Sequence, residues 1–178
     1  MVATPELTTI SLDEFLLHPS DDYEWVDGQL LEKKGMTLRH GQIQLRLGYY
    51  WRSYMLSSGQ GGEVYTEALC RTAKQGRRPD VSYLTPELVS QHAGATALPQ
   101  SFSLIAEIAS PDDSGEELLA KAKEYLQSGC QEVWLVFPEN LWIIVITHEK
   151  HLLLTVGEVV STQNVLKGFS VAIDELLA

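Results

Sequence analysis

"SLIAEIASPDDSGEELLAKAKEYL", residues 103–126, joins an apolar run to a helical pattern and decides the fold. The apolar run over 103–110 predicts a buried β-strand, and the pattern over 113–128 predicts the helix that follows it. Glu107 lies inside the strand. A carboxylate in an apolar run is costly unless something pairs with it, so Glu107 is the first candidate for a functional residue.

The flanking patterns predict a mixed α/β layer architecture around one sheet. Asp27-Gly28 is a strong turn dipeptide and predicts a hairpin over 23–34. Apolar residues at helical spacing predict a long helix over 38–58. Further elements are expected as a short helix within 8–19, strands over 62–72, 79–84, 132–138, 141–148 and 151–157, a polar loop at 73–78, an irregular region at 85–101, and a closing strand and turn within 168–178.

Length and composition bound the class of protein. The chain has 178 residues, of which 44% are hydrophobic, and this fits a single domain over 1–178. No apolar run is long enough for a membrane span, and residues 1–10 lack the features of a signal peptide, so a cytoplasmic protein without a membrane partner is expected. Cys70 and Cys130 cannot form a disulfide framework or a zinc site alone and are expected to be reduced core or strand residues.

The net charge of −11 is evidence against tight non-specific DNA binding, since phosphate binders usually carry a basic surface. An acidic chain needs a local basic patch, bound metal ions or a different substrate. Arg71, Lys74, Arg77 and Arg78 cluster beside Asp80, and they could meet a phosphate backbone. The alternative for this cluster is a solvated loop.

Asp80 follows Pro79 and is expected at the beginning of a strand. The alternative is an ordinary strand-end aspartate. On the helix after Glu107, Lys121 and Lys123 flank an apolar arc on opposite edges, and helical spacing alone does not choose between them. The arc consists of Leu118, Leu119, Ala122, Tyr125 and Leu126.

Asp80, Glu107 and one of these lysines together predict a metal site. Two carboxylates from adjacent strands can hold Mg²⁺, or Mn²⁺, with the remaining positions filled by water and substrate phosphate. Such an ion stabilises charge on a phosphoryl oxygen and lowers the pKa of a bound water. The metal would then be the partner that Glu107 needs.

Several stretches carry a resemblance to a known family: "YEWVDGQLLE", "RHGQI", "RRPDVSYL", "AEIASPDDS" and "KAKEYLQSGCQEVWLV". With these the chain resembles the PD-(D/E)XK nuclease superfamily, and more narrowly a widespread bacterial branch of restriction-endonuclease-like proteins. The resemblance implies an α/β (α+β) fold with a mixed sheet flanked by helices. It also implies a Mg²⁺-dependent endonuclease acting on DNA. The oligomeric state stays open, with a homodimer as one candidate, since many relatives in the superfamily pair to cut both strands.

The chain departs from the superfamily motif at Ala109, where a lysine would stand two residues after Glu107. In this branch the lysine lies on the following helix, four residues before a tyrosine. This matches Lys121 and favours it over Lys123. The resemblance also suggests that Glu24 and His40 lie near the site, the former as a further ligand and the latter at a phosphate or metal-bound water. The alternatives are a solvated strand residue for Glu24 and a helix-capping or exposed histidine for His40.

Two other functions remain open beside the nuclease. The acidic charge and the missing lysine at position 109 favour a nuclease-fold domain that has become an interaction or regulatory module. A metal-dependent hydrolase of smaller phosphate esters is a weaker alternative. The chain contains no nucleophile elbow, phosphate-cradling loop, dinucleotide fingerprint or His-Glu-x-x-His motif, and Trp134 and Trp142 are interpreted as core residues.

Overall fold

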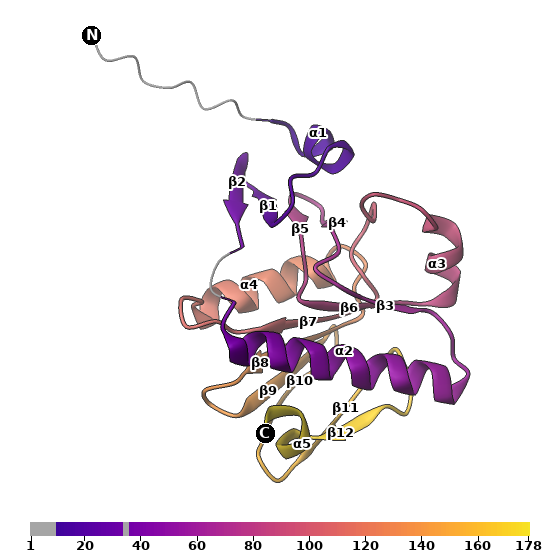
Figure 1. Cartoon of the computed structure of the whole chain (residues 1–178), viewed down its shortest axis with the longest axis vertical. Helices are drawn as coiled ribbons and strands as arrows, with labels where there is room; N and C mark the ends of the chain where they lie inside the picture. Colours follow the sequence, from indigo (N-terminus) through magenta and orange to yellow (C-terminus); the bar gives the residue numbers. More distant parts are fainter. Residues whose placement is uncertain (1–9, 34–35) are drawn as a thin grey trace.

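The computed structural model describes residues 10–33 and 36–178 (Figure 1). The expectation about a signal peptide concerns residues 1–10, of which 1–9 lie outside the described part. The helices are α1 (Leu12–Leu17), α2 (Leu38–Ser58), α3 (Pro86–His92), α4 (Gly115–Leu126) and α5 (Ile173–Leu177). The strands are β1 (Tyr23–Val26), β2 (Gln29–Glu32), β3 (Glu63–Thr66), β4 (Cys70–Arg71), β5 (Gly76–Arg77), β6 (Val81–Leu84), β7 (Leu104–Ile108), β8 (Glu132–Phe137), β9 (Trp142–Thr147), β10 (His151–Thr155), β11 (Val159–Ser161) and β12 (Ser170–Ala172).

The larger sheet has the strand order β10-β9-β8-β7-β6-β3. β7 and β8 run parallel, and α4 is the crossover between them, as a parallel pair requires. The neighbouring pairs on both sides are antiparallel. The expected mixed sheet flanked by helices is therefore confirmed, and the stretch over 103–126 forms its centre.

Side chains of β7 alternate between two hydrophobic cores on the two faces of this sheet. Leu104, Ala106 and Ile108 pack in the core that α2 and α5 cover, whereas Ile105 packs in the core under α4. Glu107 belongs by alternation to the face of Ile105. The helix α2 buries Ile43, Leu47, Trp51 and Met55, and α4 buries Leu118, Ala122 and Tyr125.

A smaller sheet, in the order β2-β1-β5-β4, and the pair β11–β12 lie beside the larger one, so the expectation of one sheet is wrong. The strand β5 lies within the predicted polar loop at 73–78, and α3 lies within the predicted irregular region at 85–101. Neither element produces a pattern that can be recognised in the sequence, for a physical reason in each case. β5 is two residues long, and α3 places only Leu88 and Val89, both partly buried, against the core, which is too few for a periodic apolar pattern.

The hairpin and the long helix are confirmed at the expected places. Asp27 and Gly28 both adopt positive φ, as a two-residue hairpin turn of this kind requires. α2 begins after Thr37, whose hydroxyl accepts a hydrogen bond from the His40 backbone N–H, and it ends at Gly59 in the left-handed conformation.

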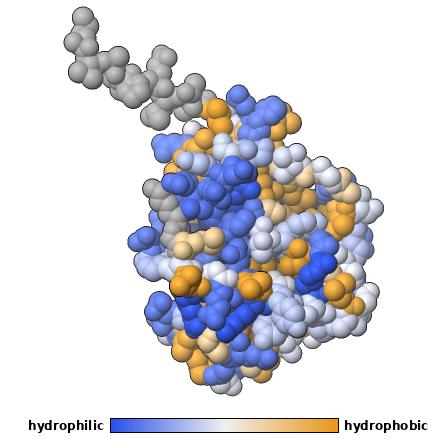
Figure 2. All heavy atoms as spheres, in the orientation of Figure 1, coloured by the Kyte–Doolittle hydropathy of each residue, from blue (hydrophilic) through white to orange (hydrophobic). Residues whose placement is uncertain are grey.

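The surface is mainly hydrophilic between the hairpin β1–β2 and α2, and separate hydrophobic spots follow α2 (Figure 2). None of the helices in the described residues has the length and hydropathy needed to cross a bilayer. Cys70 and Cys130 are buried free thiols, as expected. Trp134 is a core residue, but the interpretation of Trp142 is wrong, because it begins β9 with 43% of its surface exposed.

Candidate active site

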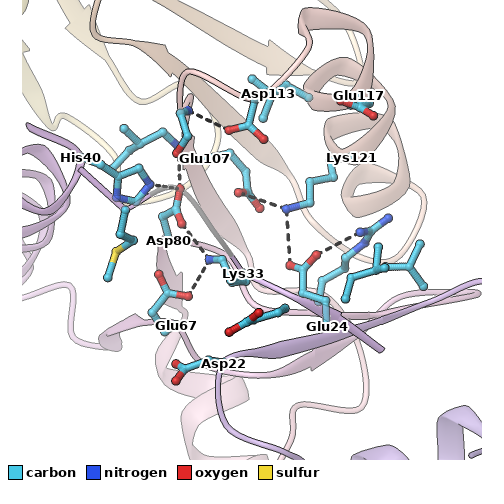
Figure 3. A pocket seen from close by; sticks show the side chains of 18 of the residues that line it. Asp22, Glu24, Lys33, His40, Glu67, Asp80, Glu107, Asp113, Glu117 and Lys121 are labelled. Atoms are coloured by element: carbon cyan, nitrogen blue, oxygen red, sulfur yellow. Dashed lines mark hydrogen bonds and ion pairs between the residues drawn. The ribbon is translucent and has the colours of Figure 1, made fainter. Parts of the chain in front are cut away.

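A cleft of about 450 Å³ opens where the hairpin β1–β2, the beginning of α2, the ends of β6 and β7, and the side of α4 meet (Figure 3). Glu24, Lys33, His40, Glu67, Arg77, Asp80, Glu107 and Lys121 line its inner part, and Asp22, Glu32, Asp113, Glu117 and Glu124 are also among its lining residues. Acidic side chains thus outnumber basic ones, and the cleft favours cations over free phosphate.

Asp80 immediately precedes the first residue of β6, as expected from its position after Pro79. In the antiparallel register Val81 is opposite Ala106, so one further step brings Asp80 to the position of Glu107. One oxygen of Asp80, Oδ2, accepts a 2.7 Å hydrogen bond from the Ile108 backbone N–H. The carboxylate is therefore fixed to the strand that carries Glu107. Burial works to raise the pKa of Asp80, but His40 and Lys33 outweigh it and hold that pKa well below its usual range.

Glu107 is buried, and its partners come from α4. The Tyr125 hydroxyl donates a 2.6 Å hydrogen bond to Oε1, and the Lys121 ammonium lies 3.5 Å from Oε2. Burial raises the pKa of Glu107 to about 7, with a further contribution from the charge of Asp80, against the opposing effect of Lys121. The partners that the buried carboxylate of Glu107 requires are thus an ammonium and a hydroxyl group, and both come from α4.

Lys121, and not Lys123, reaches the cleft. The buried stripe of α4 is narrower than the predicted arc, because Leu119 is 46% exposed. The remaining buried residues, Leu118, Ala122 and Tyr125, shift the centre of the stripe toward Lys121, which lies three residues after Leu118 and four before Tyr125. Lys123 is exposed. This shift of the buried stripe distinguishes the two lysines, which helical spacing alone could not do.

Glu24 is buried on β1 and closes the opposite side of the cleft. Its Oε1 accepts a 2.9 Å hydrogen bond from the Arg78 backbone N–H and lies 3.4 Å from the Lys121 ammonium, while Oε2 lies 3.1 Å from Arg77. Burial works to raise the pKa of Glu24, but Lys121 and Arg77 outweigh it and the pKa is lowered. Lys121 therefore bridges two carboxylates from different sheets.

Both arginines predicted to contact phosphate have internal partners. Arg77 forms a two-point contact with Glu124, at 3.1 Å through Nε and 2.9 Å through Nη2. Arg78 donates to the backbone carbonyls of Tyr23, Glu67 and Ser20. The guanidinium groups hold the smaller sheet against α4 and the neighbouring turns, and their geometry gives no support to phosphate contacts.

His40 lies in the first turn of α2 with its Nε2 3.2 Å from Oδ2 of Asp80. Burial works to lower the pKa of His40, but the contact with Asp80 outweighs it and raises the pKa. Within the described residues the buried Nδ1 has no hydrogen-bond partner. His40 thus braces Asp80 from the side opposite to Glu107.

Sequence reasoning missed three members of the site: Lys33, Glu67 and Gln44. The Lys33 ammonium lies 2.8 Å from Oδ1 of Asp80 and 2.6 Å from Oε2 of Glu67. The Gln44 side-chain amide donates to Glu67 and to the Asp80 carbonyl, each at 2.9 Å. Gln44 lies one turn after His40 on α2, and this spacing was the available signal; Lys33 gave none, because it simply follows an exposed strand.

The donor chemistry fits a hard cation held by two carboxylates. Asp80 and Glu107 direct oxygen atoms into the same cleft (Figure 3), and oxygen is the ligand that Mg²⁺ and Mn²⁺ prefer. Among the described residues no three Asp, Glu, His or Cys side chains are gathered closely enough to hold a metal by themselves. A bound ion would therefore complete its shell with water and substrate oxygens, as is common for Mg²⁺.

Comparisons with known proteins identify the family and the fold. A family model described as "Uma2: Putative restriction endonuclease" matches residues 11–174. The crystal structure of a "putative nuclease belonging to DUF820" from Anabaena variabilis has a TM-score of 0.83 with 20% sequence identity, over 94% of this chain and 97% of that chain. At this identity the likeness shows the fold. No match was found among curated proteins.

Proposed function

Because the chain belongs to the Uma2 family of restriction-endonuclease-like proteins, we propose that it is a Mg²⁺- or Mn²⁺-dependent endonuclease that hydrolyses DNA phosphodiester bonds. The single observation that carries the proposal is the arrangement of Asp80, Glu107 and Lys121. Two buried carboxylates from neighbouring strands and one ammonium from the crossover helix meet in a cleft.

Asp80 and Glu107 would hold the ion, which when bound supplies positive charge at the phosphoryl oxygens and makes a bound water more acidic. Both carboxylates are already oriented, Asp80 by the Ile108 N–H and Glu107 by the Tyr125 hydroxyl. Groups that are fixed before the substrate arrives need no reorganisation during the reaction.

Lys121 is proposed to stabilise the charge that develops during hydrolysis. The oxygen of a water, which gives up a proton, joins phosphorus, and the bond to the sugar oxygen breaks as that oxygen takes up a proton, so negative charge gathers on the phosphate group before these transfers are complete. Burial works to lower the pKa of Lys121, but Glu107 and Glu24 outweigh it and raise that pKa. The ammonium therefore stays charged inside the cleft, beside the carboxylates that would hold the metal.

The acidic rim and the net charge of −11 set the conditions for DNA binding. Without a divalent ion the cleft repels phosphate, so DNA binding is expected to need the metal. A homodimer, in which two clefts would cut the two strands, is part of the same proposal. It is tested by light scattering of the protein with and without duplex DNA.

The decisive experiment is a cleavage assay on supercoiled plasmid with Mn²⁺ and with Mg²⁺. The wild type should nick or linearise the plasmid, whereas Asp80→Asn should not. Equal cleavage by both proteins would overturn the proposed role of Asp80 and with it the mechanism. Circular dichroism of Asp80→Asn shows whether the variant is folded.

The second candidate is a nuclease-fold interaction module without catalysis. It is favoured by the lysine at 33, which already neutralises Asp80, and by Ala109 in place of the expected lysine. This candidate predicts no cleavage of duplex, single-stranded or branched DNA with either metal. Any metal-dependent cleavage that Asp80→Asn abolishes decides for the nuclease.

A further inference from the structure

Lys33 lies in a cage of oxygen atoms at the back of the cleft. Its ammonium is 2.6 Å from Oε2 of Glu67, 2.7 Å from the Arg78 carbonyl oxygen and 2.8 Å from Oδ1 of Asp80. Two carboxylates and a carbonyl are the kind of oxygen shell that a hard cation takes in proteins. The ammonium of Lys33 therefore occupies a site whose oxygen atoms are suited to bind a cation.

The position of Lys33 is held by the backbone as well as by charge. Lys33 directly follows β2, and its backbone N–H donates a 2.8 Å hydrogen bond to the Asp22 carbonyl across the hairpin. Burial works to lower the pKa of Lys33, but Asp80, Glu107 and Glu67 outweigh it and keep the ammonium charged. Glu67 is itself held by Gln44, so the cage is fixed on more than one side.

Both oxygens of Asp80 are engaged in this arrangement. Lys33 takes Oδ1, while His40 and the Ile108 N–H take Oδ2. A divalent ion that binds Asp80 through Oδ1 meets the ammonium at short distance, and two cations at such a distance repel strongly. Lys33 must therefore leave Asp80 before that oxygen can coordinate a metal.

We propose that Lys33 is an internal competitor of the divalent ion for the carboxylate of Asp80, so that metal binding requires its release. The inference rests on the proposed function, because it takes Asp80 as a metal ligand. In the metal-free protein Lys33 neutralises Asp80.

The test is a calorimetric titration with Mn²⁺ of the full chain in three forms: the wild type, Lys33→Met and Lys123→Met. Lys123 is exposed on α4, so its replacement gives the same change of net charge at a distance from the cleft. We expect Lys33→Met to bind Mn²⁺ about ten-fold more tightly than the wild type, or better, and Lys123→Met to bind like the wild type. Added Mn²⁺ should also raise the Tm of Lys33→Met more than that of the wild type.

A second measurement uses the unaltered protein and does not depend on the folding of a variant. Labelling by an amine-reactive reagent, followed by mass spectrometry, reports how accessible each lysine is. Mn²⁺ should increase the labelling of Lys33, whose side chain is 20% exposed without metal, and leave that of Lys123 unchanged. Unchanged labelling of Lys33 at saturating Mn²⁺ overturns the inference.

The outcomes separate this inference from the proposed function. If Asp80→Asn abolishes Mn²⁺ binding and cleavage while Lys33→Met binds Mn²⁺ no more tightly than Lys123→Met, the nuclease stands and the competitor is refuted. If no form binds Mn²⁺, both the metal site and the competitor are refuted. Tighter binding by Lys33→Met without any cleavage supports the competitor and counts against the nuclease.

Discussion

The Tyr125 hydroxyl donates a 2.6 Å hydrogen bond to Glu107, and both side chains are buried. This contact joins the C-terminal end of β7 to the last turn of α4. It shows that a tyrosine interpreted from periodicity as part of an apolar arc has a second role. The same residue packs in the core with its ring and orients a candidate ligand with its hydroxyl.

Tyr125→Phe is expected to lower the free energy of unfolding by about 1–3 kcal/mol, because a buried carboxyl group loses a hydrogen-bond donor while the ring still fills its place. Urea unfolding measures the change. Tyr49→Phe is the matched control, since the Tyr49 side chain is 64% exposed and should tolerate the loss. An equal effect of the two substitutions would show that the contact with Glu107 contributes nothing.

Lys121→Ala is expected to reduce the rate of plasmid cleavage by about 10²–10³-fold, because the ammonium that faces the developing phosphate charge is removed. The assay is single-turnover cleavage with Mn²⁺. Lys123→Ala has the same charge change on the same helix and should cleave like the wild type. If Lys123→Ala lost activity while Lys121→Ala stayed active, the proposed role would belong to Lys123 and not to Lys121.

Arg77→Ala is expected to lower the free energy of unfolding by about 3–5 kcal/mol, because Glu24 and Glu124 lose the guanidinium that pairs them. Thermal or urea unfolding in the absence of DNA is the measurement. Lys74→Ala, in the same segment but exposed, should have little effect. A variant of Arg77 that is fully stable but binds DNA less tightly would instead restore the phosphate contact predicted from the sequence.

The two thiols are expected to be unreactive in the folded protein at pH 8. Burial raises the pKa of Cys130 to about 12 and raises that of Cys70 well above its usual value, so almost no thiolate is present. A colorimetric thiol reagent should react slowly with the native protein and rapidly in urea. Ser57→Cys, on the exposed side of α2, provides a reactive control. Rapid reaction of the native wild type would mean that the core opens.

The sequence predicted those parts of the fold that follow a regular pattern. The helix over 38–58 and the hairpin at Asp27-Gly28 rest on periodicity and on a turn dipeptide, and both are confirmed. α3 could not be found in this way, because none of its residues is buried and Pro86 at its start is equally typical of a loop. Short strands such as β5 are defined by their partners and not by their own residues.

Within the candidate site, the cost of burying Glu107 was a sound physical guide, since it led to a carboxylate with two partners on α4. The choice of Lys121 needed the resemblance, because the exposure of Leu119 cannot be read from hydrophobicity. Lys33 could not be found from the sequence at all. Its partners Glu67 and Asp80 lie far along the chain, and only the folded hairpin brings it to them.

The hairpin β1–β2 carries Glu24 on one strand and places Lys33 at the end of the other. An outward swing of this hairpin would separate Lys33 from Asp80 and Glu24 from Lys121 in a single movement. Both of these ion pairs in the cleft therefore depend on the position of the hairpin. A force applied at the tip of the hairpin, far from any reacting atom, would therefore expose the carboxylate of Asp80 and release the ammonium of Lys121.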